Sequence, residues 1–352
     1  MAKKCKLAGF LALFAFCAVS APSEDTAPAF PSIPSQIGGI SVPQSEYAQK
    51  QIEKYIEQFS KPFGKQQLYN ILDDGEAYRL YVRRELKKRA MPAALEYLPV
   101  VESEYNPLAV SRSGARGLWQ FMDNSIKGLL RKTSYIDERF DPWKSTDAAL
   151  TKLQENYRQF KDWPLAIAAY NCGAGAMKKI LSKSKQKTFW YIAENSLLRD
   201  QSVQYVPKLL AIALLAENGS AYGLELPEIT VSTRYAEFDY VTTAEEISLA
   251  RLSSELKMEP SILQKLNPSL LKNATPPDEK YELRLPSGMK QSALIALAQI
   301  TVRSEGTVHT VQKGETLWSI SRKYGISVKE LRDKNGLGED EPLKTGKKLY
   351  IK

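Results

Sequence analysis

A carboxylate at the end of an apolar run is the first feature of the sequence that could do chemistry. Glu102 directly follows the apolar stretch 98–101, and a second carboxylate, Glu104, lies two residues further on. If Glu102 ends a buried helix, burial would raise its pKa, and a carboxyl that keeps its proton near neutral pH can act as a general acid. A surface or capping role is the simpler interpretation of these residues alone. Residues two apart do not share a helix face, so Glu104 is not expected to pair with Glu102.

Polar groups downstream fall into short motifs. Ser111 precedes Gly117-Leu118-Trp119-Gln120, and Ala169-Tyr170-Asn171-Cys172-Gly173 ends an apolar helical stretch. A helix that ends in glycine is the simpler interpretation of the second motif. Tyr205 stands alone before Val206. No positional argument selects a partner for Glu102 among four remaining carboxylates: Asp123, Asp137, Asp141 and Glu155.

The composition excludes several kinds of site. There is one histidine, His309, so zinc sites with several histidine ligands cannot be built, and a Ser-His-Asp triad would have to use it. Lys plus Arg number 49 against 40 Asp plus Glu, a net charge of +9 that weakly favours an acidic polymer as partner. Neither a Gly-rich phosphate loop nor a basic-aromatic nucleic-acid face is present. We therefore expect no metal, no cofactor and no nucleic-acid partner.

Residues 1–21 have the pattern of a secretory signal peptide, with lysines before an apolar run and small residues at its end. That run is shorter than the ~20 residues that span a bilayer, so we expect cleavage and export to the periplasm or cell envelope. Lipidation of Cys17, with outer-membrane attachment, is the alternative, although Phe16 stands where a lipobox has a small residue. Only Cys172 remains after cleavage, so an internal disulfide is excluded.

The elements that must position these residues divide the chain into domains. Residues 22–45 are rich in Pro, Ser and Gly and are expected to form a flexible linker. Residues 46–222 are predicted to form one all-α domain. Within it, apolar residues recur at helical spacing over 144–160 after an Asp141-Pro142 start, and 207–217 should be a buried helix.

Two later stretches, 235–286 and 307–352, share a strand–helix–helix–strand pattern and are separated by an expected linker over 287–306, within which residues 291–298 could form a short helix. Gly314 and Gly325 mark breaks in the second stretch, and Thr316 and Ser327 are candidate N-caps. The two are predicted to be divergent copies of one βααβ unit. In the second copy, Leu317, Trp318, Ile320 and Leu331 are expected in the core. The predicted fold class is multidomain: an all-α domain followed by small α+β modules.

Taken in order, the motifs resemble the soluble lytic transglycosylase family, which has a lysozyme-like helical catalytic domain. The resemblance rests on Glu102-Ser103, Gly117–Gln120, Ala169–Gly173 and Tyr205-Val206. The longer string 91–103 and Phe140-Asp141-Pro142 resemble the branch called membrane-bound lytic murein transglycosylase D. Residues 307–352 resemble a LysM module, which binds glycans that contain N-acetylglucosamine.

This resemblance implies an activity on peptidoglycan glycan strands. Glu102 would be the single general acid and base. It would protonate the oxygen between N-acetylmuramic acid and N-acetylglucosamine, and then take the proton of the muramic C6 hydroxyl. That hydroxyl would close a 1,6-anhydro ring, so neither a water nor a second carboxylate is needed.

The resemblance also implies the residues around the substrate. Trp119 would offer a ring face to a sugar, and Cys172 departs from the usual alanine. The supporting residues in the catalytic domain would be Ser111, Trp119, Gln120, Tyr170, Asn171 and Tyr205. The glycan contacts of the LysM module would be Gly314, Glu315, Thr316, Leu317, Asn335, Gly336 and Leu337. The first copy has Thr243-Ala244-Glu245-Glu246 in place of Gly-Glu-Thr and is not expected to bind glycan well.

Two alternatives stay open at this point. A muramidase-type hydrolase on the same fold would need a positioned water and a second carboxylate. A catalytically inactive wall-binding scaffold would keep only the LysM function. Endolytic or exolytic cleavage and the oligomeric state are left open by the sequence.

Overall fold

The computed structural model describes residues 30–227, 238–277, 279–304, 308–338 and 342–351. Contacts within the chain separate Met1–Ser32 from Ile33–Lys352. The expected signal peptide, including Cys17, lies outside the described residues. Within the described ranges, no helix combines the length and apolar character that crossing a bilayer requires.

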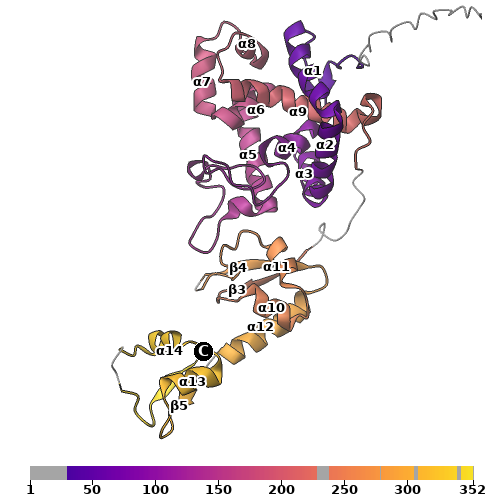
Figure 1. Ribbon diagram of the computed structural model, residues 1–352. Coiled ribbons are helices and arrows are strands. Elements are labelled where there is room, and N and C mark those ends of the chain that lie inside the picture. Colours follow the sequence, from indigo (N-terminus) through magenta and orange to yellow (C-terminus); the bar gives the residue numbers. More distant parts are fainter. Residues whose placement is uncertain (1–29, 228–237, 278, 305–307, 339–341, 352) are drawn as a thin grey trace, which may run out of the picture. The chain divides into compact units, whose positions relative to one another are not determined.

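Residues 46–222 are helical, as predicted (Figure 1). The α-helices are α1 (Glu46–Ser60), α2 (Pro62–Asp74), α3 (Glu76–Lys88), α4 (Leu98–Ser103), α5 (Pro142–Phe160), α6 (Trp163–Cys172), α7 (Ala174–Lys183), α8 (Phe189–Glu194) and α9 (Asp200–Asn218). Short 3₁₀ turns lie at Ala93–Tyr97, Asp123–Ser125, Glu138–Phe140 and Gly219–Tyr222. The long segment between α4 and α5 carries the Gly117–Gln120 motif.

Helix α9 is the centre of the helical core. Its residues 209–215 are all buried, and it packs against α1, α4 and α6. The sequence predicted this buried helix over 207–217, but it begins at Asp200, and Pro207 lies inside it. The predicted start of α5 is confirmed, because Asp141 is its N-cap and accepts from the backbone N–H groups of Trp143 and Lys144. A side-chain acceptor there satisfies donors that the first turn leaves unpaired.

The prediction of a flexible linker over 22–45 is wrong for its described part, residues 30–45. Strands β1 (Gln36–Ile37) and β2 (Ile40–Ser41) form an antiparallel hairpin whose two isoleucines are buried. The turn passes so close to Ala94 that a Cβ on Gly38 would lie 2.6 Å from the Ala94 nitrogen. The two glycines therefore serve the turn, and the buried isoleucines anchor the segment to the helical core.

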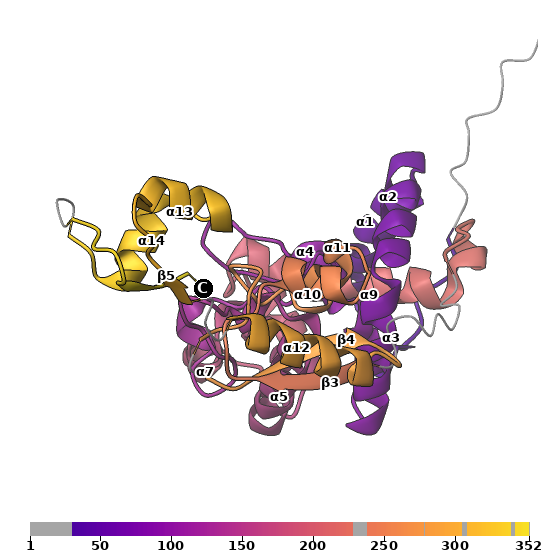
Figure 2. The same ribbon diagram turned by 90° about the horizontal axis from the view of Figure 1, so that it is seen from below.

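The first βααβ unit is confirmed and is larger than predicted. Strands β3 (Phe238–Thr243) and β4 (Tyr281–Pro286) pair antiparallel, and α10 (Leu249–Glu255) and α11 (Pro260–Leu266) connect them. Helix α12 (Lys290–Ser304) lies across this strand pair (Figure 2). It buries Ala293, Ala296 and Ile300 in the same core. The linker expected over 287–306 is thus mostly a helix of this module.

The second βααβ unit is confirmed as well. Strands β5 (Val308–Thr310) and β6 (Lys348–Tyr350) pair antiparallel, with α13 (Leu317–Tyr324) and α14 (Val328–Asn335) between them. Thr316 and Ser327 cap the two helices through reciprocal capping boxes, as the sequence predicted. The module has its own small core, which includes Val311, Ile320 and Leu349.

Candidate active site

Glu102 lies in the last turn of α4, and the chain turns sharply after it. Leu98, Pro99 and Val100 are buried, whereas the Glu102 side chain is only partly exposed. Helix α4 ends because Glu104 adopts a left-handed conformation, with φ +53°. The exposed Glu104 accepts a hydrogen bond from Gln67 at 2.9 Å. The two carboxylates therefore lie in different environments.

The environment of Glu102 raises its pKa from 4.5 to about 7. Burial is the main cause, because it disfavours the charged form. The Tyr205 hydroxyl on α9 donates to Glu102 Oε1 and acts in the opposite direction. Burial of this carboxyl argues against the simpler interpretation of Glu102 as a surface or capping residue. A group with this pKa exchanges protons readily at neutral pH.

Tyr170 lies behind the carboxyl at the end of α6. Its hydroxyl donates to the Trp119 carbonyl oxygen at 2.9 Å, and its ring meets Phe121 edge-on. Burial and the nearby Glu102 charge both raise the pKa of Tyr170 well above its ordinary value. Tyr170 therefore stays a neutral hydrogen-bond donor and links α6 to the Gly117–Gln120 loop.

Trp119 is not where the resemblance placed it. Its side chain is 0% exposed, so it cannot offer a ring face to a sugar. The indole Nε1 donates to Thr146 Oγ1 on α5 at 2.8 Å. Trp119 thus supports the loop from inside, and the motif alone could not show this because it does not state which side chains point outward.

Ser111 and Gln120 hold the loop itself. Ser111 Oγ accepts from the Ala115 N–H at 3.0 Å and lies 3.0 Å from Ser113 Oγ. Gln120, with φ +47°, donates to the Gly117 carbonyl oxygen at 2.9 Å. These contacts are within the loop, whereas the resemblance implied contacts near Glu102 or the substrate.

One residue of the site was missed by the sequence analysis. Ser103 follows Glu102, and its hydroxyl donates to the Leu118 carbonyl oxygen at 2.8 Å. This bond joins the helix end that carries Glu102 to the Gly117–Gln120 loop. The pairing of the Glu102-Ser103 and Gly117–Gln120 motifs in the sequence was the available signal.

Asn171 and Cys172 complete the end of α6. Asn171 Oδ1 accepts from the Ser202 hydroxyl at 2.8 Å, which joins α6 to the first turn of α9. Burial raises the pKa of the Cys172 thiol. Asn171 therefore joins the end of α6 to the first turn of α9.

Three of the other carboxylates named above are held by cations. Asp137 is buried and pairs with Arg139 at 2.6 Å. Asp123 pairs with Lys132 at 2.8 Å, and Asp141 pairs with Arg284 at 3.1 Å. Glu155 is exposed on α5. Each of the three paired carboxylates therefore has a structural role that explains it.

Side chains of the LysM motif mostly hold the module together. Glu315 lies 2.6 Å from His309 Nε2 and accepts from the Gln312 N–H. Asn335 bonds to the backbone of Tyr350 as both donor and acceptor. Leu317 and Leu337 belong to the core, and Gly336 caps α14 with φ +59°. Glycan recognition at these positions would then depend mainly on their backbone groups.

Trp318 departs from the expected core. Its side chain is 64% exposed, with the Arg322 guanidinium 5.5 Å from the ring centroid. Helix α13 begins at Leu317, so Leu317 and Ile320 share the buried face and Trp318 points away from it. An exposed indole beside the Gly314–Thr316 turn is a candidate glycan contact that the sequence analysis missed.

Comparison with protein families gives three matches along the chain. The Transglycosylase SLT domain matches residues 80–193. The LysM-like domain of lytic transglycosylase MltD matches 237–302, and the LysM domain matches 309–352. The middle match includes α12, in agreement with the enlarged first module.

The chain is also similar to individual proteins. The chain is 30% identical to membrane-bound lytic murein transglycosylase D of Escherichia coli strain K12 over 331 residues, which is 89% of this chain and 70% of the relative. A shorter stretch of 46 residues, 13% of this chain and 14% of the relative, is 54% identical to N-acetylmuramoyl-L-alanine amidase sle1 of Staphylococcus epidermidis. An inactive mutant of lytic transglycosylase Slt from Pseudomonas aeruginosa matches at TM-score 0.35 and 23% identity, covering 44% of this chain and 26% of that one.

Proposed function

The chain belongs to the membrane-bound lytic murein transglycosylase D family and is a peptidoglycan lytic transglycosylase, and from this premise we propose that Glu102 is its single general acid and base. The bond to be cleaved is the β-1,4 bond between N-acetylmuramic acid and N-acetylglucosamine. One observation carries the proposal: a carboxyl at the end of α4 with a pKa of about 7, contacted by the Tyr205 hydroxyl.

The proposed reaction has two proton transfers at one carboxyl. Protonated Glu102 gives its proton to the glycosidic oxygen as the bond to C1 breaks. The resulting carboxylate takes the proton of the muramic C6 hydroxyl, whose oxygen bonds to C1. Because the attacking group belongs to the substrate, its effective concentration is high. The product is a 1,6-anhydromuramic end, and no water is consumed.

The surroundings of the other carboxylates support this route over hydrolysis. A glycosidase pair places two carboxyl groups about 5–9.5 Å apart around the bond. Burial and the Tyr205 hydroxyl shift the pKa of Glu102, and no second carboxylate among the described residues contributes to that shift. Asp123, Asp137 and Asp141 are paired with cations.

The neighbouring residues receive supporting roles. Tyr205 would orient the Glu102 carboxyl, and Tyr170 would hold the Trp119 backbone beside it. Ser111 and Gln120 would shape the loop on which the acetamido group of the sugar rests. Asn171 would fix the end of α6 through Ser202.

The LysM domain supports peptidoglycan as the partner of this chain. The LysM match and the similarity to the membrane-bound relative fit a location in the cell envelope. We propose that the turn Gly314–Thr316 with Leu317, and the turn Asn335–Leu337, bind the glycan through backbone groups, and that this module retains the enzyme on its substrate. Export through residues 1–21 and a lipid on Cys17 are separate proposals. Mass spectrometry of the mature protein purified from envelopes tests both, because cleavage and acylation change its mass.

Muropeptide analysis tests the reaction directly. Purified peptidoglycan is digested with the wild-type protein, Glu102→Gln and Glu104→Gln, and the products are identified by mass spectrometry. We expect anhydro products, lighter by one water than reducing-end products, from the wild type and from Glu104→Gln. Glu102→Gln should be slower by about 10²–10⁴-fold. Reducing ends would instead support a hydrolase, and no release by the wild type would support a binding scaffold.

A further inference from the structure

The first βααβ module is joined to the catalytic region by backbone hydrogen bonds. Ile136, between α4 and α5, forms an antiparallel bridge with Leu270. The Asp137 N–H donates to the Ser269 carbonyl oxygen at 2.9 Å, and the Leu271 N–H donates to the Tyr135 carbonyl oxygen at 2.8 Å. Residues 135–137 thus act as an extra strand segment for the module.

The two parts also share a hydrophobic core. The Ile136 side chain is 0% exposed and lies in the cluster that contains Leu249, Leu263 and Leu283 of the module. Tyr135 packs against the same cluster, and its hydroxyl donates to Glu246 at 3.1 Å. Without the module, the apolar Ile136 side chain would be exposed to water, so its burial favours this arrangement.

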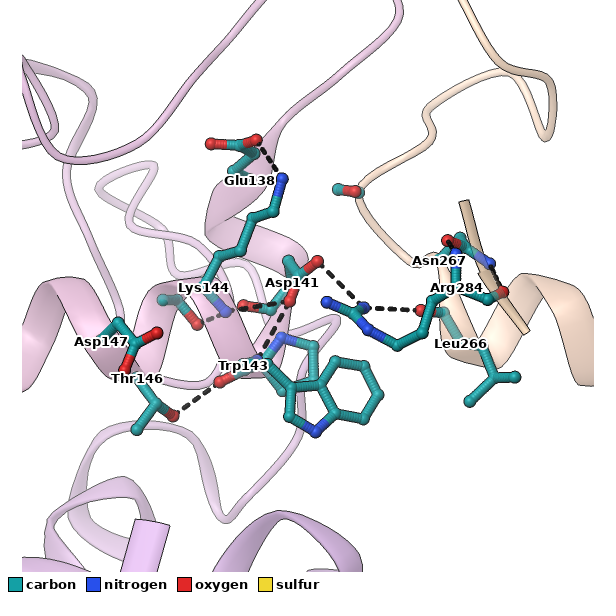
Figure 3. A network of polar contacts seen from close by, with 12 residues as sticks. Glu138, Asp141, Trp143, Lys144, Thr146, Asp147, Leu266, Asn267 and Arg284 are labelled. Carbon is teal, nitrogen blue, oxygen red and sulfur yellow. Dashed lines mark hydrogen bonds and ion pairs between the residues drawn. The ribbon is translucent and has the colours of Figure 1, made fainter. Parts of the chain in front are cut away.

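A buried ion pair lies at the centre of the contact. Arg284 Nη1 on β4 is 3.1 Å from Asp141 Oδ2, and the side chains are 7% and 2% exposed. Figure 3 shows Arg284 pointing across to Asp141 and Trp143. The guanidinium carbon is 4.1 Å from the centroid of the Trp143 ring. Buried charges are tolerated when they are paired and hydrogen-bonded, so each of these groups depends on the other.

The module holds Arg284 in a fixed position. Asn267, at the end of α11, accepts from the Arg284 N–H at 2.9 Å and donates to the Arg284 carbonyl oxygen at 2.8 Å (Figure 3). Arg284 Nη1 also donates to the Leu266 carbonyl oxygen at 2.8 Å. The charge is therefore placed by both the backbone and the side chain before it meets Asp141.

Asp141 connects this pair to the site around Glu102. While Oδ2 accepts from Arg284, Oδ1 caps the first turn of α5. In that turn Thr146 donates to the Pro142 carbonyl oxygen at 2.6 Å and accepts from Trp119 at 2.8 Å. The Trp119 carbonyl oxygen in turn accepts from Tyr170. The start of α5 and the loop beside Glu102 are thus one hydrogen-bonded unit.

We propose that the 238–300 module is a structural part of the catalytic unit and that Arg284 is a positioning residue for the reaction, acting through Asp141 and α5 on the loop that carries Trp119 and Gln120. This inference rests on the proposed function of Glu102. It gives the module a role other than glycan binding, and it explains why the module lacks the Gly-Glu-Thr signature of the second copy.

The test is the full-length variant Arg284→Met, assayed on soluble uncrosslinked glycan strands at a temperature where circular dichroism shows it folded. We expect kcat to fall at least ten-fold while KM changes less than two-fold. The alkaline limb of the pH–rate profile should move to lower pH, because a loosened loop admits water to Glu102, which Tyr170 and Tyr205 otherwise enclose. A purely structural role would lower only the melting temperature.

Two further variants make the result specific. Asp141→Asn combined with Arg284→Met removes both charges but keeps a capping side chain, so we expect it to recover most of the lost kcat. Glu279→Gln removes the half-buried partner of Arg131 at the same interface and should leave kcat and the pH profile unchanged. If Arg284→Met does not fold, Arg284→Lys replaces it, and the proposal then requires a lowered kcat in that folded variant.

A folded Arg284→Met with the kcat and pH profile of the wild type would overturn the proposal. So would a double variant that stays folded but remains as slow as Arg284→Met. Neither outcome touches the proposed chemistry, because the wild type would still release anhydro products and Glu102→Gln would still fail to do so.

Discussion

At Glu102, burial and one hydrogen bond act on the same pKa in opposite directions. Burial raises it, and the Tyr205 hydroxyl lowers it by stabilising the carboxylate. The resulting value of about 7 suits a group that must first give a proton and then accept one. Tyr205 therefore sets the balance between the two steps, because it favours the form that acts as base.

Replacing Tyr205 by phenylalanine should shift this balance. Without the hydroxyl, the carboxylate loses its hydrogen bond, and the pKa of Glu102 rises further. We expect the alkaline limb of the pH–rate profile to move to higher pH and kcat at neutral pH to fall several-fold. A profile that is unchanged or displaced to lower pH would contradict this account of Tyr205.

The raised pKa also makes the stability of the protein depend on pH. The folded state binds the Glu102 proton more tightly than the unfolded state, so stability is lost as pH rises from 4.5 towards 7. Glu102→Gln removes this loss. We expect the variant to be about 3 kcal/mol more stable than the wild type at pH 8 and equally stable at pH 4. Urea unfolding at both pH values measures the difference; equal stabilities at pH 8 would contradict the burial of this carboxyl.

At the scale of elements, the Gly117–Gln120 loop depends on a close backbone approach. A Cβ on Gly117 would lie 1.7 Å from the Arg139 carbonyl oxygen, and φ there is +79°. Gly114, in the same loop, has φ +86° but meets nothing within 4 Å. The first glycine is therefore required by space and conformation, the second by conformation alone.

Alanine at these two glycines should give different results. Gly114→Ala should cost about 1–2 kcal/mol, the ordinary price of a left-handed non-glycine residue, and keep most activity. Gly117→Ala should cost more and lower activity at least ten-fold, because the Arg139 backbone must move away from the loop. Thermal melts and product release rates measure both effects, and equal behaviour of the two variants would rule out the steric explanation.

Elements with a regular apolar period could be predicted from the sequence. The start of α5 and both βααβ units followed from capping residues and spacing. The β1–β2 hairpin was taken for part of a linker, because turn residues dominate it. Where α12 lies, only a short helix over 291–298 was considered, because α12 contributes only a few small or β-branched residues to a shared core. Their stability comes from tertiary contacts that no local pattern reveals.

The candidate site was predictable to a similar degree. The order of motifs identified Glu102, Tyr170 and Tyr205, and the structure brings Tyr205 into contact with Glu102. Trp119 was assigned to the wrong face, and Ser103 was missed. Arg284 was not predictable, because it lies 143 residues from Asp141 and only the fold brings the two together.

At the scale of the whole molecule, the two modules differ in how they are held. The core of the second module consists of its own residues, whereas the core of the first includes Ile136 of the catalytic region. The second module should therefore be removable without harm to the first. Similar βααβ topology thus supports two different relationships to the catalytic region.

Deleting residues 307–352 tests this difference. We expect kcat on soluble glycan strands to stay within about two-fold of the wild type, and the fraction of protein that sediments with peptidoglycan sacculi to fall at least five-fold. Sedimentation of the Glu102→Gln variants, with and without the deletion, measures retention without digestion. Full retention after the deletion would assign wall binding to another part of the chain.

The bridge between Ile136 and Leu270 limits how early the catalytic region can be completed as the chain is synthesised. A ribosome adds ~5–20 residues per second, so the 143 residues from Asp141 to Arg284 take roughly 7–30 s to synthesise. Until residues 269–284 have been made, residues 135–141 lack the backbone partner and the cation that complete them. The nascent chain therefore acquires its lytic competence late, after most of its length has been made.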